Sequence, residues 1–515
     1  MPMHSSSILL AGLAVALAAA GSAVAAPDTS RVIVAFKPGA AAAGKRAVTA
    51  ARGTVKVELD WADAVAIEVP TQALAGLARN PNVAYIEEDA KRYPLALTSP
   101  SGPPYATGQL VPYGIKMVQA DQLSDASAGN RKVCIIDSGY DNAHEDLAGN
   151  PVNGIYDSGT GNWYTDENHH GTHVAGTVAA INNSGTGVVG VAPNGRLQLH
   201  IVKVFGADGW AYSSSLAAAA NQCRTYGANV ISMSLGGSVK VRAEETTFNQ
   251  LYNANVLSIA AAGNDGNKRV SYPAGYASVV SVAAIDENKA WASFSQFNAD
   301  VEIAAPGVAV LSTVPMGTGS SSALTVGGTA YAPGDMEGSP KLSRSGTLAD
   351  FGLGGTVTAG SMTGRVCLIQ RGTYDFATKV ANCQASGGVG AVVYNNVAGS
   401  FGGTLGGVAT SIPSVTASDT EGTALRAQLG QSATVSVAAS NYAYFDGTSM
   451  ATPHVSAVAA LVWSLHTNCT AAQIRNSLNR SAEDLGAAGR DTRFGFGLVR
   501  AKAAHDRINS LGCGN

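Results

Sequence analysis

The chain has 515 residues, of which 46% are hydrophobic and 13% charged, with 60 glycines and a formal net charge of -3. This length exceeds that of one ordinary domain, and this composition is typical of a large globular protein with many tight turns rather than of a disordered chain. No basic stripe with interleaved aromatic residues accompanies the near-neutral charge, so we expect no nucleic-acid partner.

The first 26 residues have the pattern of a secretory signal. Their apolar run from Ile8 to Ala20 is too short to span a bilayer, residues 23–26 offer an A-x-A cleavage pattern, and no later segment has about 18 uninterrupted apolar residues. We therefore expect an exported, extracellular mature protein without a membrane anchor. Because no lysine or arginine precedes the apolar run, an amphipathic start is the alternative.

A compact unit of strands and one helix is predicted between Arg31 and Tyr93. Its expected elements are strands at residues 32–36, 64–69 and 82–87 and a helix at residues 71–79. A unit of about 65 residues buries a modest core, so we expect it to be stable mainly when docked on a partner surface, as a pro-segment is. The proline-rich stretch at residues 97–104 resists regular structure, which places the processing region between Ala96 and Gln109.

The main body alternates short apolar strands with helical segments. These are predicted at residues 132–136, 171–181, 198–204, 213–226, 229–234, 246–253 and 256–260. The alternation predicts an α/β fold with a doubly wound, mostly parallel sheet, and the continuous apolar strands fit a sheet that is buried on both faces. Ligands of such a sheet bind at the carboxyl ends of its strands.

A β-rich domain is inserted into this body. From residue 318 to about residue 441 the sequence is rich in Gly, Ser and Thr and has short strands, with a helix expected at residues 376–385, and helical patterning resumes at Thr448. The predicted main domain therefore has two parts, residues 109–317 and 442–515.

The six cysteines are too few for a disulfide scaffold but fit three bridges. Proximity along the chain favours two pairs, Cys367 with Cys383 and Cys469 with Cys513. The remaining Cys134 and Cys223 could form a third bridge or stay as buried thiols.

Three segments each place a reactive side chain where a parallel sheet exposes it. Asp137 ends an apolar strand, where its carboxylate can orient and stabilise an imidazole. His170 stands at the start of a predicted helix, and Ser449 follows Gly447 at the start of another. Taken singly, such segments are more often a turn, a structural histidine and a helix cap.

Together and in this order, the three motifs resemble those of the subtilisin family of serine endopeptidases. They read Asp137-Ser-Gly, His170-Gly-Thr-His and Gly447-Thr-Ser-Met-Ala in this chain. The resemblance implies that Ser449 attacks the peptide carbonyl, that His170 takes and returns the proton, and that Asp137 holds the imidazole. It also implies an Asn264 amide that stabilises the oxyanion, although a turn residue beside Gly263 is the alternative.

The same resemblance identifies a substrate-binding surface. Its expected residues are Ser234, Leu235 and Gly236 on an edge segment and Ala261 and Gly263 in the pocket wall. We expect a broad preference for apolar or aromatic residues before the cleaved bond. Trp210 and Tyr212 lie where the family contacts residues further upstream, although surface aromatics can be ordinary packing.

A structural calcium ion is a further expectation from the family. The expected ligands are Gln109, Asp146, Ile181, Asn183, Thr186 and Val188. The loop carries one residue more than the family pattern, so a plain Asn/Gly turn is the alternative. We expect no catalytic cofactor: His170-x-x-His173 lacks the glutamate of a zinc motif. The histidines His144, His169, His173 and His454 are interpreted as structural.

The resemblance extends to the remaining parts of the chain. Residues 27–108 are similar to an inhibitor-type propeptide with its processing linker, and residues 318–441 are similar to a protease-associated domain, which could select substrates or act as an inert spacer. We therefore predict a monomeric secreted endopeptidase of proteins and peptides, matured by autocatalytic removal of its own inhibitory propeptide. A binding protein that has lost catalysis and an adhesion module are the alternatives.

Overall fold

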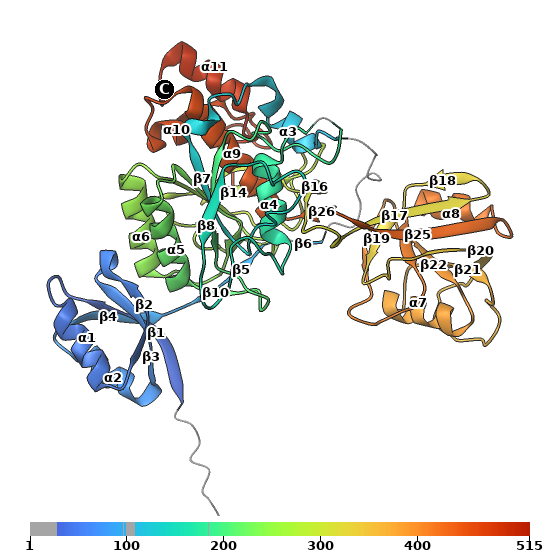
Figure 1. Ribbon diagram of the computed structural model, residues 1–515, viewed down its shortest axis with the longest axis horizontal. Coiled ribbons are helices and arrows are strands. Elements are labelled where there is room, and N and C mark those ends of the chain that lie inside the picture. The colour runs from blue at the N-terminus through green and yellow to red at the C-terminus, as the bar shows by residue number, and fades with distance from the viewer. Residues whose placement is uncertain (1–27, 96, 99–108, 184) are drawn as a thin grey trace, which may run out of the picture.

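The computed structural model describes residues 28–95, 97–98, 109–183 and 185–515, which form three bodies (Figure 1). The predicted signal at residues 1–26 and most of the predicted processing region lie outside the described residues. Within the described part of the chain, no helix is both long and apolar enough to cross a membrane.

The N-terminal body is a four-stranded antiparallel sheet with two helices on one face. The strands are β1 (Thr29–Phe36), β2 (Thr54–Leu59), β3 (Ala64–Pro70) and β4 (Val83–Glu88), in the order β2-β3-β1-β4, and the helices are α1 (Ala41–Ala50) and α2 (Leu74–Ala78). Alternate residues of β1 point to opposite faces: Val34 joins the core under the helices, whereas Ile33 and Ala35 pack against Ala217 and Val241 of the central body.

Three details of this body differ from the prediction. Strand β2 was not predicted, because only Leu59 of its six residues is buried. The helix expected at residues 71–79 is a short 3₁₀ turn, Thr71–Ala73, that leads directly into the five residues of α2. Helix α1, in an alanine-rich stretch with few large apolar residues, was not predicted because only Gly44 and Val48 face the core.

The central body contains the predicted doubly wound sheet. Its seven strands are all parallel, in the order β15-β14-β13-β11-β7-β9-β8. Their bounds are β7 (Lys132–Asp137), β8 (Val152–Ile155), β9 (Gln198–Lys203), β11 (Val230–Met233), β13 (Leu257–Ala261), β14 (Val279–Ile285) and β15 (Val301–Pro306). Because all of them run in one direction, their carboxyl ends meet at one edge.

Helices cover both faces of this sheet, as the continuous apolar strands predicted. Val133 and Ile135 of β7 pack with α4 (His170–Ala179) and α9 (Thr448–Leu465), whereas Cys134 and Ile136 pack with α5 (Ser213–Thr225) and α6 (Arg242–Asn253). Nearly all of α9 is buried. Helix α6 begins four residues before the predicted 246–253. The remaining helices are α3 (Tyr113–Met117), α10 (Ala471–Ser481) and α11 (Ala501–Leu511).

All six cysteines are paired. The bridges are Cys134–Cys223, Cys367–Cys383 and Cys469–Cys513. The two pairs expected from proximity are confirmed, and the pair that the sequence left open also forms a bridge, which links β7 to α5.

The insertion is a third body that leaves and rejoins the central one at a single place (Figure 1). Its first long strand, β17 (Gly319–Val326), pairs antiparallel with its last, β25 (Ser432–Ser440). The other strands are β18 (Thr329–Tyr331), β19 (Gly334–Glu337), β20 (Ser343–Asp350), β21 (Arg365–Gln370), β22 (Gly390–Tyr394), β23 (Gly403–Thr404) and β24 (Ser414–Ala417), with helices α7 (Phe376–Ala385) and α8 (Asp419–Arg426). The predicted β-rich character and the bounds of α7 are confirmed.

Short strands line the carboxyl edge of the central sheet. They are β5 (Lys91–Pro94), β6 (Leu97–Thr98), β10 (Ala211–Tyr212), β12 (Leu235–Gly236), β16 (Val310–Thr313) and β26 (Tyr442–Asp446). Strand β5 lies between β10 and β12, and β6 pairs with β26. The segment that follows the N-terminal body therefore crosses the edge at which the sequence places the reactive side chains.

Candidate active site

Asp137 and His170 form a buried hydrogen-bonded pair. Asp137 is the last residue of β7, and its Oδ1 lies 2.7 Å from His170 Nδ1 and accepts a hydrogen bond from Ser138 N at the same distance. Both side chains are almost fully buried. The second ring nitrogen, Nε2, has no hydrogen-bond partner among the described residues and is therefore available to a hydroxyl proton.

The start of α4 is fixed by contacts that orient His170. A Cβ on Gly171 would lie 2.3 Å from the Gly139 carbonyl oxygen, so only glycine lets the helix approach the loop after β7 so closely. Asp166 ties the same region together: its carboxylate accepts from Ser138 Oγ at 2.8 Å and from Thr172 N at 2.8 Å.

Asp166 is a residue that the sequence analysis missed. Its Oδ1 also accepts from His169 N at 2.9 Å, and its Oδ2 accepts from the Thr172 hydroxyl at 2.7 Å. An aspartate shortly before a predicted helix start is a typical capping signal, and it could have indicated this role.

Ser449 lies in the first turn of α9. Gly447 precedes the helix with a φ of 149°, within the region that favours glycine. The Ser449 hydroxyl donates to the carbonyl oxygen of Leu95, and the Ser449 carbonyl accepts from Ser234 Oγ at 2.7 Å. The predicted nucleophile therefore faces a backbone carbonyl of the chain's own N-terminal part.

The Asn264 amide faces the same carbonyl oxygen. Its Nδ2 donates to Leu95 O at 2.8 Å, while its Oδ1 accepts from Thr448 N at 2.9 Å and from Thr448 Oγ1 at 2.8 Å. Because Thr448 holds the oxygen end of the amide, the nitrogen end points towards Leu95. Thr448, which the sequence analysis did not single out, is thus a positioning residue.

The expected substrate-binding residues surround the segment that ends at Leu95. Pro94 pairs with Leu235 and Tyr93 pairs with Gly236, and Leu95 N donates to Ser234 O at 3.1 Å. The predicted pocket residues Ala261 and Gly263 are buried at the end of β13. At the outer end of β5, Lys91 Nζ lies 4.0 Å from the centre of the Trp210 ring, and Lys91 pairs with Tyr212.

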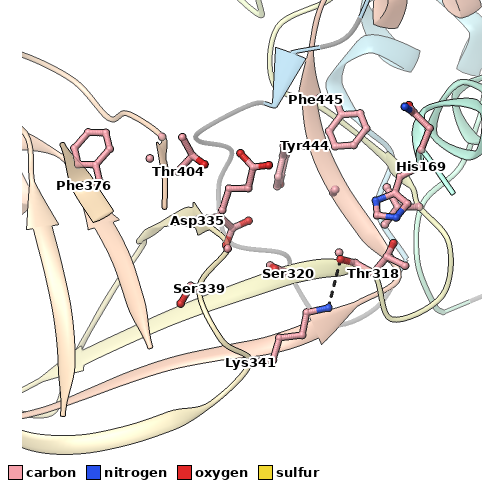
Figure 2. A pocket seen from close by; sticks show the side chains of 18 residues that line it. His169, Thr318, Ser320, Asp335, Ser339, Lys341, Phe376, Thr404, Tyr444 and Phe445 are labelled. Atoms are coloured by element: carbon pink, nitrogen blue, oxygen red, sulfur yellow. Dashed lines mark hydrogen bonds between the residues drawn. The ribbon is translucent and has the colours of Figure 1, made fainter. Parts of the chain in front are cut away.

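A cleft of about 670 Å³ separates the central body from the insertion (Figure 2). His169, Tyr444 and Phe445 line it from the central body, and Asp335 and Lys341 line it from the insertion. Lys341 Nζ reaches back to the carbonyl of Gly317 at 2.5 Å. Because β26 also pairs with β6, chain that continues beyond Leu95 runs towards this cleft.

The residues expected to bind calcium lie together. Gln109 Nε2 lies 3.0 Å from Ile181 O and 3.4 Å from both Asn183 Oδ1 and Val188 O, so three oxygens converge on one point. Asp146, which is buried, lies beside them and accepts from Asn183 Nδ2 at 2.7 Å and from Val188 N at 2.8 Å. The Thr186 hydroxyl donates to Asn183 Oδ1 at 3.3 Å.

This donor set fits a hard cation. It consists of amide, carbonyl and carboxylate oxygens, which calcium prefers, and rotation of the Gln109 amide would add its oxygen to those already converging. Burial raises the pKa of Asp146, against the effect of the hydrogen bonds it accepts, so a bound cation would offset the cost of its charge. Within the described ranges, no group of three or more His, Cys, Asp or Glu side chains could hold a metal.

The other motif histidines make structural contacts. His144 Nε2 lies 2.9 Å from Asn441 O, and His454 Nδ1 lies 2.8 Å from Met450 O. His173 stacks on Phe445 with ring centres 4.4 Å apart. Burial lowers the pKa of His173 to about 3 and that of His454 to about 4, so both are neutral near pH 7.

Comparisons with known proteins agree with this geometry. The model of the subtilase family matches residues 129–338 and 385–497, and that of the PA domain matches residues 329–425. Subtilisin NAT from Bacillus subtilis subsp. natto is 36% identical over 272 residues, 52% of this chain and 67% of that protein. Subtilisin DY from Bacillus licheniformis is 40% identical over 240 residues, 45% of this chain and 84% of that protein.

A solved structure is similar over a larger part of the chain. It is the crystal structure of the psychrophilic subtilisin-like protease Apa1 from the Antarctic psychrotroph Pseudoalteromonas sp. AS-11, with 44% identity and a TM-score of 0.63. The match covers 79% of this chain and 100% of that chain.

The buried neutral histidines predict a loss of stability in acid. An unfolded histidine has a pKa of about 6.5, so between this value and the lower native pKa the unfolded state binds more protons and the free energy of unfolding falls as pH falls. Each pKa unit by which a native histidine lies below its unfolded value accounts for about 1.4 kcal/mol of the free energy of unfolding that is lost in acid. Calorimetry at pH 7, 5.5 and 4.5 should show a decreasing thermal midpoint. The decrease should be smaller for His454→Leu, and an equal decrease in both chains would contradict this origin.

Proposed function

Because the chain belongs to the subtilase family of serine endopeptidases and carries an inserted PA domain, we propose that Asp137, His170 and Ser449 are its catalytic triad. Asn264 donates the side-chain hydrogen bond to the oxyanion. The observation that carries this proposal is the Leu95 carbonyl oxygen, which accepts from both the Ser449 hydroxyl and the Asn264 amide. A peptide carbonyl in this position is a substrate carbonyl for acyl transfer.

The proposed reaction gives each of these groups one role. Ser449 Oγ attacks the carbonyl carbon while His170 Nε2 takes the hydroxyl proton, and Asp137 holds Nδ1 and stabilises the imidazolium. The negative charge that forms on the carbonyl oxygen is stabilised by the Asn264 amide and the Ser449 N–H. The proton then passes from His170 to the leaving amine as the C–N bond breaks. Water, deprotonated by His170, hydrolyses the acyl-enzyme.

We further propose that the first substrate is the chain itself. Residues 27–95 are the propeptide in this proposal, and the bond that breaks follows Leu95, at the amino-terminal limit of the processing region expected from the sequence. Support comes from β5, which is paired on both sides like an extended substrate, and from Leu95 at the reactive serine. The leucine agrees with the expected apolar preference before the cleaved bond.

After cleavage the propeptide would stay bound and inhibit the enzyme. Its carboxylates cap two helices of the catalytic domain: Glu87 accepts from Arg242 N and Ala243 N at 2.9 Å each, and Asp89 accepts from Ser214 N at 2.9 Å. These contacts do not depend on the bond after Leu95. Secretion remains part of the proposal, supported by the signal pattern of residues 1–26 and by the three disulfides.

Expression of the wild type and of Ser449→Ala tests the triad, the export and the maturation together. We expect the wild type to appear in the medium, to hydrolyse casein in a manner blocked by phenylmethylsulfonyl fluoride, and to yield a mature chain whose first residue is Ala96. The Ser449→Ala chain should keep its propeptide and be inactive, because no nucleophile remains.

The possible outcomes are distinguished by N-terminal sequencing, intact mass and sedimentation. A mature chain that begins between residues 97 and 109 would contradict cleavage after Leu95 and leave the triad standing. Equal behaviour of the two chains would contradict the triad and favour a binding protein. A sedimentation coefficient above that of a single chain would contradict the expected monomer.

We also propose that calcium binds at the loop formed by residues 181–188. The residues that would hold the ion are Gln109, Asp146, Ile181, Asn183, Thr186 and Val188, and the ion would supply no catalytic step. The convergence of the three oxygens on the Gln109 amide supports this proposal. Cleavage after Leu95 leaves Gln109 in the mature chain, so the site would persist.

Removal of calcium should lower the stability of the mature enzyme. A site-bound ion stabilises the folded state by about 4 kcal/mol at a thousandfold excess over its Kd. A chelator should therefore decrease the thermal midpoint, and calcium, but not magnesium, should restore it. The shift should be much smaller in Gln109→Ala and unchanged in the exposed control Gln222→Ala. An equal calcium shift in Gln109→Ala would contradict the site.

For the PA domain we propose the bounds 318–441 and a contribution to binding of substrate residues beyond the cleaved bond. The antiparallel pairing of β17 with β25 supports the bounds, since it brings both ends of the insertion together. The pairing of β6 with β26, next to the cleft lined by Asp335 and Lys341, supports the contribution.

Deletion of the insertion separates this role from that of a spacer. Gly319 and Ser440 are paired, so a two-residue Asn-Gly turn can replace residues 320–439. We expect the deletion variant to hydrolyse a tetrapeptide anilide, which ends at the cleaved bond, at a rate within about threefold of that of the wild type. Casein should be hydrolysed roughly tenfold more slowly, which corresponds to a loss of about 1.4 kcal/mol of transition-state stabilisation. Equal rates on casein would identify an inert spacer.

A further inference from the structure

An arginine of β5, in the segment that follows the N-terminal body, is fully buried against the central body. The side chain of Arg92 has no exposed surface, and neither has that of its partner Glu244. The guanidinium contacts both carboxylate oxygens, with Nε 3.2 Å from Oε1 and Nη2 2.5 Å from Oε2. Nη2 also donates to Val239 O at 3.1 Å. This is the bidentate arrangement that fits arginine and not lysine.

Glu244 is built into the central body independently of Arg92. It lies in the first turn of α6, where the helix dipole stabilises an anion. The Tyr276 hydroxyl, which accepts from Val241 N at 3.1 Å, donates to Glu244 Oε2 at 2.7 Å. The carboxylate therefore has a hydrogen-bond partner in the central body besides Arg92.

In this buried pair each charge compensates the other for its lost hydration. Burial opposes the charge of Arg92, but the Glu244 carboxylate outweighs it, and the pKa of the guanidinium is raised. An unpaired charge in the same place would lack compensation for its lost hydration. A neutral side chain of the same shape is therefore a poor occupant of this pocket.

Arg92 occupies a defined position relative to the carbonyl at Ser449. Leu95 presents that carbonyl, and Arg92 is three residues before it, so it is the fourth residue upstream of the bond. The backbone register is set on both sides of β5, by Ala211 opposite Arg92 and by Leu235 opposite Pro94. Any extended peptide that pairs in the same register places its fourth upstream side chain over Glu244.

We propose that Glu244 makes the mature enzyme select protein substrates with an arginine four residues upstream of the cleaved bond. The proposal rests on the proposed endopeptidase function and adds a second position of recognition to the apolar residue before the bond. The propeptide carries the preferred sequence, Arg92-Tyr93-Pro94-Leu95, which makes it both the first substrate and a strong inhibitor.

The first test needs no protein variant. The mature enzyme is given two peptides, acetyl-Arg-Tyr-Pro-Leu-p-nitroanilide and its citrulline counterpart, which has the same shape without the charge. We expect kcat/KM to be about a hundredfold higher for arginine, because a buried charge pair that loses one partner is strongly weakened. The lysine peptide should lie between them. Equal values for arginine and citrulline would overturn the proposal.

A variant then assigns the preference to Glu244. Glu244→Gln is made together with Arg92→Gln, so that the precursor keeps matched partners and can fold. The arginine to citrulline ratio should fall to below about threefold in this enzyme. The control is Glu245→Gln, the neighbouring acid, which instead pairs with Lys240 at 3.0 Å and should keep the full ratio. If the Glu244 variant keeps the arginine to citrulline ratio of the wild type, the assignment of the preference to Glu244 is overturned.

Hydrogen exchange separates this proposal from the proposed function. In the Ser449→Ala precursor, Arg92→Gln should increase amide exchange in β5 at least tenfold, whereas Tyr93→Phe, at an exposed position of the same strand, should not. If no chain hydrolyses casein but Arg92→Gln still loosens β5, the proposed function fails and the recognition by Glu244 stands. If casein is hydrolysed and β5 is not loosened, the recognition fails.

Discussion

The parallel pairing of seven buried strands is the constraint on which the rest of the molecule depends. Because the strands all run one way, Asp137 at the end of β7 and the loops after β11 and β13 meet at one edge. Helices α4 and α9 bring His170 and Ser449 to that edge because glycines at positions 171 and 447 permit their close approach. The candidate site is thus a consequence of strand direction, completed by two tight helix starts.

The N-terminal segment extends the same edge by backbone pairing. Strand β5 joins β10 and β12, its carbonyl at Leu95 meets Ser449 and Asn264, and Arg92 reaches Glu244. The contacts include backbone pairing that recognises an extended chain, two helix caps from Glu87 and Asp89, and one buried charge pair. Of the contacts that β5 makes, the charge pair depends most strongly on side-chain identity, which suits it to discriminate among substrates.

The fold class and the position of Asp137, His170 and Ser449 at one edge of the sheet could be predicted because their signals are local. Continuous apolar strands indicated a doubly covered sheet, and the three motifs occupy contiguous segments. What could not be predicted depends on distant partners. Helix α6 begins at Arg242 because Glu87, far away in sequence, caps it. Glu244 resembles any glutamate in a first helical turn until Arg92 and Tyr276 are placed beside it. The bridge between Cys134 and Cys223 likewise needed the packing of α5 on β7.

The pairing of β17 with β25 also affects how the two halves of the catalytic domain come together. The segment carrying Ser449 follows the insertion, so while the insertion is unfolded the serine is separated from Asp137 and His170 by a long open loop. Once the insertion has folded, Gly319 and Ser440 are neighbours, and the entropy of closing that loop has been met within the insertion itself. A folded insertion therefore holds the two halves of the catalytic domain next to each other, whatever its own length.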